Sequence, residues 1–206
     1  MGEALGAELA RLHEAVDPDG FGNFGDAPGT ERPYDSWGAY LSDYLAAHHD
    51  FLTGLGVSEE QLRRTHDVIR ATRFVDEPRF LHGDVSVRNL AVYGDDPMVV
   101  GLFDPNPVSG DPSWDLAPVA NKVALAEELR RRGGAPEQLE AHAAVWAGVR
   151  RAYGDVDEDR MLTAQLVQGV LQAESRHDRR RDGELDDREV EVADDFVRDL
   201  VDRLSG

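Results

Sequence analysis

Residues 79–118 of the chain read RFLHGDVSVRNLAVYGDDPMVVGLFDPNPVSGDPSWDLAP, and they carry the most informative pattern of the sequence. A short apolar run ends in the tripeptide His82-Gly83-Asp84, and four residues separate Asp84 from Asn89. An Asp placed five residues before an Asn puts a candidate base and a candidate magnesium ligand in one loop. The loop therefore carries the oxygen-bearing side chains that phosphoryl transfer requires, because this chemistry depends on positioning and charge neutralisation.

The residues that follow this loop predict a β-hairpin that ends in a second acidic group. An apolar pattern begins at Leu90, a turn is expected over residues 94–97, and a second apolar run over residues 98–103 leads to Asp104. A carboxylate at a strand end can hold magnesium against phosphates. Asp115 follows in the tripeptide Asp-Leu-Ala. Protein kinases place a base, an amide and a later Asp in this order.

The segments HGDVSVRN (82–89) and FDPNPVSGDPSWDLA (103–117) resemble the aminoglycoside phosphotransferase family. That family includes antibiotic kinases and fructosamine kinases, which have a protein-kinase-like fold. The resemblance implies that Asp84 is the catalytic base and that Asn89 and Asp104 bind magnesium, with ATP as co-substrate. Two further residues would support the loop structurally, namely His82 and Asp115. The alternative is that the acidic and amide residues of the motif have no joint role.

The composition limits the possible ligands. The chain has 206 residues, of which 41 are acidic and 22 are Lys or Arg, and its formal net charge is −19. Nucleic-acid binding needs a basic surface, so no nucleic-acid partner is expected. The acidity predicts either a cleft that attracts a cationic acceptor or a salt-adapted or high-GC proteome. The second interpretation is favoured because the acidic residues are spread along the chain. The chain has no Cys, which excludes disulfides and thiolate nucleophiles.

The hydrophobic pattern predicts a mostly helical α+β fold. The resemblance implies that this is the C-terminal lobe of a protein-kinase-like fold, in which a small β-hairpin carries the catalytic and metal loops. One domain is expected over residues 1–206. No membrane span and no secretion signal are predicted, so a cytoplasmic protein is expected. The sequence leaves the oligomeric state open. Helices are expected over the ranges 3–16, 35–55, 59–72, 113–132, 136–153, 157–176 and 188–204.

Three further patterns bear on the site. Ser58-x-x-Gln61 predicts a capping box at the start of the third helix. The spacing Gly20-x-Gly22-x-x-Gly25 matches a glycine loop, but its context favours a flexible or substrate-side loop. The charged run over residues 177–187 is expected to be a solvated loop.

The acceptor is expected to be a small molecule, an aminoglycoside or a sugar-like compound with a hydroxyl or amine group. In the resembled family the helices after the core motif help to form the acceptor pocket. Three residues near the end of such a helix could contact a polar substrate, namely Glu174, His177 and Asp178. A solvated helix end is the favoured alternative for these three residues.

The nucleotide half of a kinase is not evident in the sequence. The segment LARLHEA (9–15) resembles the helix that leads from the interlobe hinge into the large lobe. The one Lys of the chain, Lys122, comes after Asp115, so no phosphate-binding Lys is assigned. Three hypotheses stay open. The favoured one is a small-molecule kinase whose N-terminal lobe is encoded upstream and whose activity depends on it. The others are a non-catalytic binding remnant and a magnesium-dependent phosphate-ester hydrolase.

Overall fold

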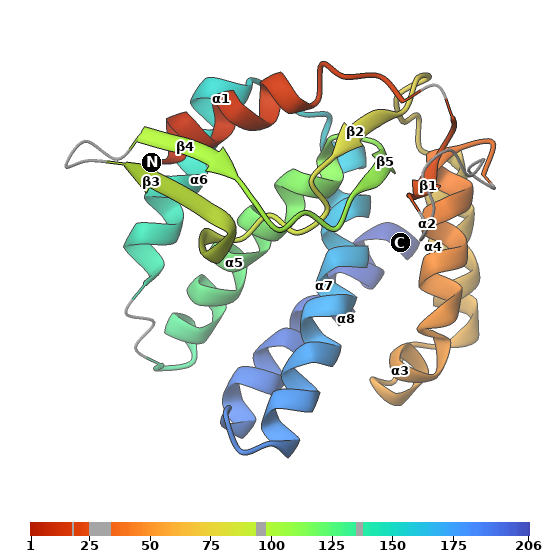
Figure 1. Ribbon diagram of the computed structural model, residues 1–206. Helices are drawn as coiled ribbons and strands as arrows, with labels where there is room; N and C mark the ends of the chain where they lie inside the picture. The colour runs from red at the N-terminus through yellow and green to blue at the C-terminus, as the bar shows by residue number, and fades with distance from the viewer. Residues whose placement is uncertain (18, 25–33, 94–97, 135–137) are drawn as a thin grey trace.

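The computed structural model describes residues 1–17, 19–24, 34–93, 98–134 and 138–206, and it is mostly helical with small antiparallel sheets (Figure 1). The helices of the described residues are α1 (Gly2–Leu12), α2 (Trp37–Ala47), α3 (His49–Gly54), α4 (Glu59–Ala71), the 3₁₀ turn η1 (Val87–Asn89), α5 (Ser113–Arg131), α6 (Leu139–Tyr153), α7 (Glu158–Arg181) and α8 (Asp187–Ser205). The strands are β1 (Gly22–Asn23), β2 (Arg79–Leu81), β3 (Leu90–Tyr93), β4 (Met98–Leu102) and β5 (Val108–Gly110). None of the described helices is long and apolar enough to cross a membrane.

Two small sheets frame the loop that precedes β3. In the first sheet β5 lies between β1 and β2, and both pairings are antiparallel. The second sheet is the expected hairpin, in which β3 pairs with β4 so that Leu90 faces Leu102 and Tyr93 faces Met98. The turn expected over residues 94–97 lies outside the described residues. β5 was not predicted from the sequence. It pairs with β2, and the chain continues from it to the start of α5.

The apolar core divides into two clusters. The larger one gathers α2, α4, α5, α7 and α8 around the buried side chains of Trp37 and Trp114, whose rings meet edge to face at a centroid distance of 5.6 Å. The smaller one joins α1, α5 and α6 to Val85 of the loop and Leu90 of β3. Leu9, Leu116 and Val149 are almost fully buried in it. Figure 1 shows α1 lying across the hairpin and α6. The loop is therefore anchored to α1, α5 and α6 through this smaller cluster.

Glycines allow α1 to approach α6 closely. A Cβ atom on Gly6 would lie 2.7 Å from the backbone oxygen of Val149, and one on Gly148 would lie 2.7 Å from the backbone nitrogen of Glu3. Real Cβ contacts are longer than this, so both positions require glycine unless the helices separate. The contact sets the position of the C-terminal end of α1, next to the loop.

Several expected boundaries are wrong. α1 ends at Leu12 rather than at residue 16, and the helix expected over 35–55 is interrupted at His48, which separates α2 from α3. α7 continues to Arg181 through part of the run expected to be a loop. Ion pairs between neighbouring turns explain the extension, since Arg181 pairs with Asp178. The helix then ends before Gly183, which has a φ of 78°.

The glycine pattern near the N-terminus also differs from its prediction. Gly22 belongs to β1 and pairs with Ser109 of β5, so this part of the expected loop is a short strand. Gly25 lies outside the described residues, as does the start of the helix expected over 136–153. That helix, α6, is described from Leu139.

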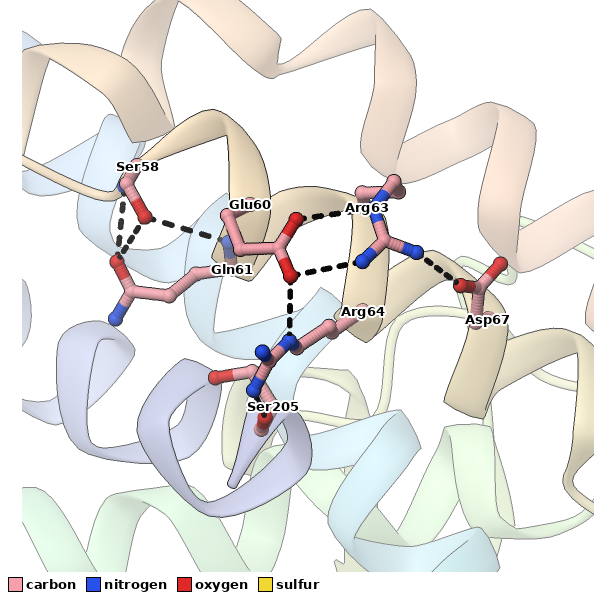
Figure 2. A network of polar contacts seen from close by, with 7 residues as sticks. All are labelled: Ser58, Glu60, Gln61, Arg63, Arg64, Asp67 and Ser205. Carbon is pink, nitrogen blue, oxygen red and sulfur yellow. Dashed lines mark hydrogen bonds and ion pairs between the residues drawn. The ribbon is translucent and has the colours of Figure 1, made fainter.

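The capping box of α4 is confirmed. The Ser58 hydroxyl accepts a hydrogen bond from the backbone nitrogen of Gln61 at 3.3 Å, and the Ser58 backbone nitrogen donates to Gln61 Oε1 at 3.0 Å (Figure 2). The Gln61 side chain also donates to Asp202 of α8 at 2.7 Å. The cap therefore begins the helix and joins it to α8.

A surface network continues from this cap along α4. Glu60 accepts hydrogen bonds from Arg63 and from Arg64, and these bonds lower the pKa of Glu60 to about 2 (Figure 2). Arg64 also donates to the backbone oxygen of Ser205 at 3.4 Å, at the end of α8. Exposed ion pairs contribute little individually, so the network orients α4 against α8 rather than dominating stability.

The capping box gives a test of the fold. Replacing Ser58 with Ala removes the acceptor for the Gln61 backbone nitrogen, and we expect the free energy of unfolding to fall by about 1 kcal/mol. Urea denaturation followed by circular dichroism measures this change. Ser175→Ala, at an exposed position inside α7, is the matched control and should leave stability nearly unchanged. Equal denaturation midpoints for the two variants would contradict the role of the cap.

Candidate active site

The loop between β2 and β3 holds an acidic and an amide side chain together. Asn89 Nδ2 donates to Asp84 Oδ2 at 2.9 Å and to the Asp84 backbone oxygen at 3.0 Å. η1 brings the two residues close, since the Asn89 backbone nitrogen donates to Ser86. Asn89 is buried, whereas Asp84 is exposed. With the amide nitrogen engaged, Asn89 Oδ1 is available as an acceptor or metal ligand.

Asp104 follows the end of β4 and is joined to the loop through its neighbour. The Phe103 backbone nitrogen donates to the Asn89 backbone oxygen at 3.0 Å. Asp104 has a φ of 56°, the one positive value among the described non-glycine residues, and its side chain is exposed. A left-handed residue of this kind is uncommon outside functional or turn positions. The structure therefore places Asp104 beside the loop that carries Asp84.

Asp115 fixes the start of the loop. Its carboxylate is buried and accepts hydrogen bonds from the His82 backbone nitrogen at 2.7 Å and from the Gly83 backbone nitrogen at 2.8 Å. Its Oδ2 also lies 3.1 Å from His13 Nε2. A buried carboxylate needs several such donors, and here the donors belong to the loop itself and to the end of α1.

The His82 ring connects the loop to the end of β4. Its Nε2 lies 3.1 Å from the Phe103 backbone oxygen, and its Nδ1 lies 3.3 Å from the Asp84 backbone nitrogen. A carbonyl oxygen can accept only and a backbone N–H can donate only. The contacts therefore assign a neutral ring with the proton on Nε2. His82 thus orients the Asp84 backbone.

Gly83 allows a close backbone approach within the loop. It has a φ of 79°, and a Cβ atom there would lie 1.7 Å from the Asn106 backbone oxygen. The Asn106 backbone nitrogen donates to the His82 backbone oxygen at 2.9 Å. The segment after Asp104 is therefore held against the loop, and a larger residue at position 83 would separate them.

Sequence reasoning missed His13. His13 immediately follows α1, and its two ring nitrogens contact Asp115 at 3.1 Å and the Tyr153 hydroxyl at 2.8 Å. Burial raises the pKa of Tyr153, and the negative charges of Asp111 and Asp115 raise it further, so its hydroxyl stays protonated. His13 lies 102 residues from Asp115 in sequence. The one available signal was the resemblance of residues 9–15 to the helix that enters the large lobe.

Lys122 was also missed as a candidate site residue. It lies in α5, seven residues after Asp115, and this spacing returns to the same helix face after two turns. Burial lowers the pKa of Lys122, and the nearby Asp84 carboxylate opposes that effect. Lys122 is therefore close to the loop, which the seven-residue spacing could have indicated.

The three weak substrate candidates lie together in a different place. Glu174, His177 and Asp178 line a pocket of about 450 Å³ beside α3, and none of the residues that line it belongs to the 82–89 loop. Their polar atoms already have partners within the protein. Glu174 contacts His48 at 2.9 Å and His177 contacts Asp194 at 2.9 Å, while Asp178 pairs with Arg181.

The oxygen atoms at the loop fit magnesium better than a softer metal. Among the described residues there is no group of three His, Cys, Asp or Glu side chains that could hold a metal ion. Asn89 Oδ1 and the Asp104 carboxylate offer hard oxygen ligands, and Asp84 lies beside Asn89. Magnesium usually takes one or two protein carboxylates and completes its shell with phosphates and water. The side chains of the loop and of the segment after β4 are thus of the chemical type that such a site uses.

Comparison with known proteins gives a consistent result. A family model described as the phosphotransferase enzyme family matches residues 1–156. The fold is similar to a thermostable mutant of the aminoglycoside phosphotransferase APH(4)-Ia, with a TM-score of 0.62, 17% identity, and coverage of 100% of this chain and 66% of that one. It is also similar to a candidate fructosamine-3-kinase from Thermobifida fusca, with a TM-score of 0.54, 20% identity, and coverage of 98% and 65%.

This chain therefore spans just under two thirds of the length of those two structures. No protein in the curated set matches it. At these identities the likeness concerns the fold, and it confirms the expected mostly helical α+β fold.

Gly83 provides a test of the loop geometry. We expect Gly83→Ala to lower the free energy of unfolding by about 3 kcal/mol or more, because both the left-handed conformation and the contact with Asn106 oppose a side chain. Gly133→Ala is a closely matched control, since Gly133 has a φ of 77° but nothing lies within 4 Å of its Cβ position. The control should cost about 1 kcal/mol. Equal losses in chemical denaturation would show that the close approach at Gly83 is unimportant.

Proposed function

The chain belongs to the phosphotransferase enzyme family, and from this we propose that it transfers the γ-phosphate of ATP to a hydroxyl or amine group of a small molecule. The observation that carries the proposal is the pairing of Asp84 with Asn89 in a loop fixed by Asp115. Two separate roles, orientation of the acceptor and binding of a metal, are thereby available within one loop.

Asp84 is proposed as the residue that orients the acceptor. Asn89 Nδ2 contacts Asp84 Oδ2, which leaves Oδ1 for the proton of an attacking hydroxyl or amine. Carboxylates are weak bases at neutral pH, so alignment of the nucleophile with the γ-phosphate accounts for the larger part of the role. The fixed Asn89 contact limits rotation of the carboxylate, as such alignment requires.

Asn89 and Asp104 are proposed as the magnesium ligands. A bound magnesium ion would neutralise charge that develops on the transferred phosphoryl group. The Phe103–Asn89 backbone hydrogen bond keeps the two ligand-bearing segments adjacent. A sugar-like compound with a hydroxyl or amine group is the proposed acceptor, since the two similar structures are described as an aminoglycoside phosphotransferase and a candidate fructosamine-3-kinase.

Calorimetric titration with ATP in magnesium tests these assignments. We expect Asp104→Asn to weaken nucleotide binding by at least tenfold, because it removes a charged ligand. Asp84→Asn should keep the parent affinity, but should lower turnover by about 10²- to 10⁴-fold in an ADP-release assay with hydroxyl and amine acceptors. Asp76→Asn, at an exposed loop position, is the control and should behave like the parent.

Two outcomes would overturn the assignments. Equal nucleotide affinity in Asp104→Asn and the parent would remove Asp104 from the metal site. Magnesium-dependent release of phosphate from esters without ATP, abolished by Asp104→Asn, would favour a hydrolase that uses the same residues instead of a kinase.

A further inference from the structure

A cavity next to the loop has a charge opposite to that of the chain as a whole. It measures about 550 Å³, and its lining residues come from α5, the C-terminal half of α7 and the N-terminal parts of α6 and α8. Lys122, Arg176 and Arg179 line it together with His142, and Glu189 is the one carboxylate among the described residues in its wall. A cavity of this size suits a small molecule. The formal net charge of the chain is −19, so three cations in one wall are unexpected.

Among the described residues, the cations at the centre of this cavity form no ion pair with a carboxylate. Among the described residues Lys122 forms neither a hydrogen bond nor an ion pair, and the Arg176 guanidinium donates to the backbone oxygen of Gln172 at 3.0 Å. Arg179, at the rim, pairs with Glu184 at 3.0 Å. Lys122 and Arg176 are both partly buried. The nearby carboxylates of Asp84 and Glu189 oppose the effect of burial on the pKa of Lys122 and of Arg176, but neither forms an ion pair with them. Partly buried cations without a direct ion-pair partner are costly, so the arrangement favours an external anion.

The electrostatic effects within the cavity agree with this picture. Burial lowers the pKa of Lys122, and the positive charges of Arg88 and Arg176 lower it further. Burial also lowers the pKa of His142, and the positive charge of Lys122 lowers it further. The positive charges of Lys122 and Arg176 therefore act on one another, and a bound anion would relieve the repulsion between them.

Lys122 also connects the cavity to the loop. Lys122 and His142 border a smaller gap of about 20 Å³ whose opposite wall includes Val85 and Ser86, the two residues after Asp84. The Asp84 carboxylate acts on the pKa of Lys122, which places the two charges near each other. An anion held at Lys122 would consequently belong to a molecule within reach of the loop.

We propose that this cavity binds an oxyanion group, phosphate or carboxylate, of the acceptor whose hydroxyl or amine meets Asp84. Lys122 and Arg176 are the principal contacts, and His142 and Arg179 complete the wall. That the bound molecule is the acceptor rests on the function proposed above, whereas the binding of an oxyanion at Lys122 does not. The substrate class is thus an anionic small molecule rather than a polycation, because three cations next to the site would repel an aminoglycoside.

The pocket beside α3 supports this choice by contrast. There Glu174 and Asp178 already pair with His48 and Arg181, so its charges are compensated within the protein. The cavity at Lys122 differs because its inner cations are left without carboxylate partners. An external anion is therefore expected at Lys122 and not beside α3.

Thermal unfolding and calorimetric titration with inorganic phosphate test the proposal, without ATP or magnesium and against sodium chloride of equal ionic strength. We expect phosphate to bind the parent chain and raise its melting temperature. Lys122→Met and Arg176→Gln should weaken phosphate binding by about tenfold or more, because each removes a charge-assisted contact. Malonate and glycerol, run in parallel, distinguish carboxylate from phosphate recognition and provide a neutral comparison.

Folding and binding are separated by the choice of variants. Lys122→Met keeps most of the aliphatic stem and removes a repelled charge, so without phosphate its melting temperature should equal or exceed that of the parent. Arg203→Gln, at the exposed end of α8, is the control and should bind phosphate like the parent. Phosphate binding that is unchanged in Lys122→Met, or no oxyanion binding by the parent, would overturn the proposal. Displacement of phosphate by ATP alone would overturn the assignment to the acceptor.

Because the phosphate titration itself uses no nucleotide, and competition with ATP is a separate measurement, its failure is distinguishable from failure of the proposed kinase activity. Loss of magnesium-dependent ATP binding in Asp104→Asn would stand even if phosphate did not bind at Lys122. Conversely, phosphate binding that depends on Lys122 would stand if no ATP were bound.

Discussion

The hydrogen bonds to the Asp115 carboxylate are the constraint on which the site depends. The carboxylate is 1% exposed and faces the backbone nitrogens of His82 and Gly83 as well as the ring of His13. Leaving a buried carboxylate without donors is strongly unfavourable, so the start of the loop, the first turn of α5 and the end of α1 must meet at this point. The remaining site geometry follows from that meeting.

The loop and the end of β4 act as one unit because three contacts join them. The backbone oxygen of Phe103 accepts a hydrogen bond from the His82 ring, and the backbone nitrogen of Phe103 donates to the backbone oxygen of Asn89. In the third contact, the backbone nitrogen of Asn106 donates to the backbone oxygen of His82. Most of these contacts use backbone atoms, which have far less freedom than long side chains. The exposed carboxylates of Asp84 and Asp104 therefore rest on a rigid frame, as preorganised chemistry requires.

The parts of the fold and of the site that local sequence could predict are those encoded within one short segment. The spacing of Asp84 and Asn89, the hairpin after them and the Ser58 cap each arise from residues a few positions apart. His13 could not be predicted in the same way, since its contact with Asp115 spans 102 residues and requires α1 to pack against α6. The extension of α7 to Arg181 depends on side-chain ion pairs that a charged composition alone does not define.

The charge of the whole chain does not determine the charge of its cavities. At physiological ionic strength the field of exposed carboxylates decays within about 8–10 Å, so distant acidic side chains on the surface have little influence inside a pocket. Lys122 and Arg176, in contrast, come from different helices that tertiary packing brings to one wall, where burial strengthens their fields. The acidic composition predicted either a cleft that attracts a cation or a salt-adapted or high-GC proteome. The cations next to the loop argue against the first of these two interpretations. The acidic side chains that face solvent therefore give little information about the ligand, whereas in the proposed site the partly buried cations would select it.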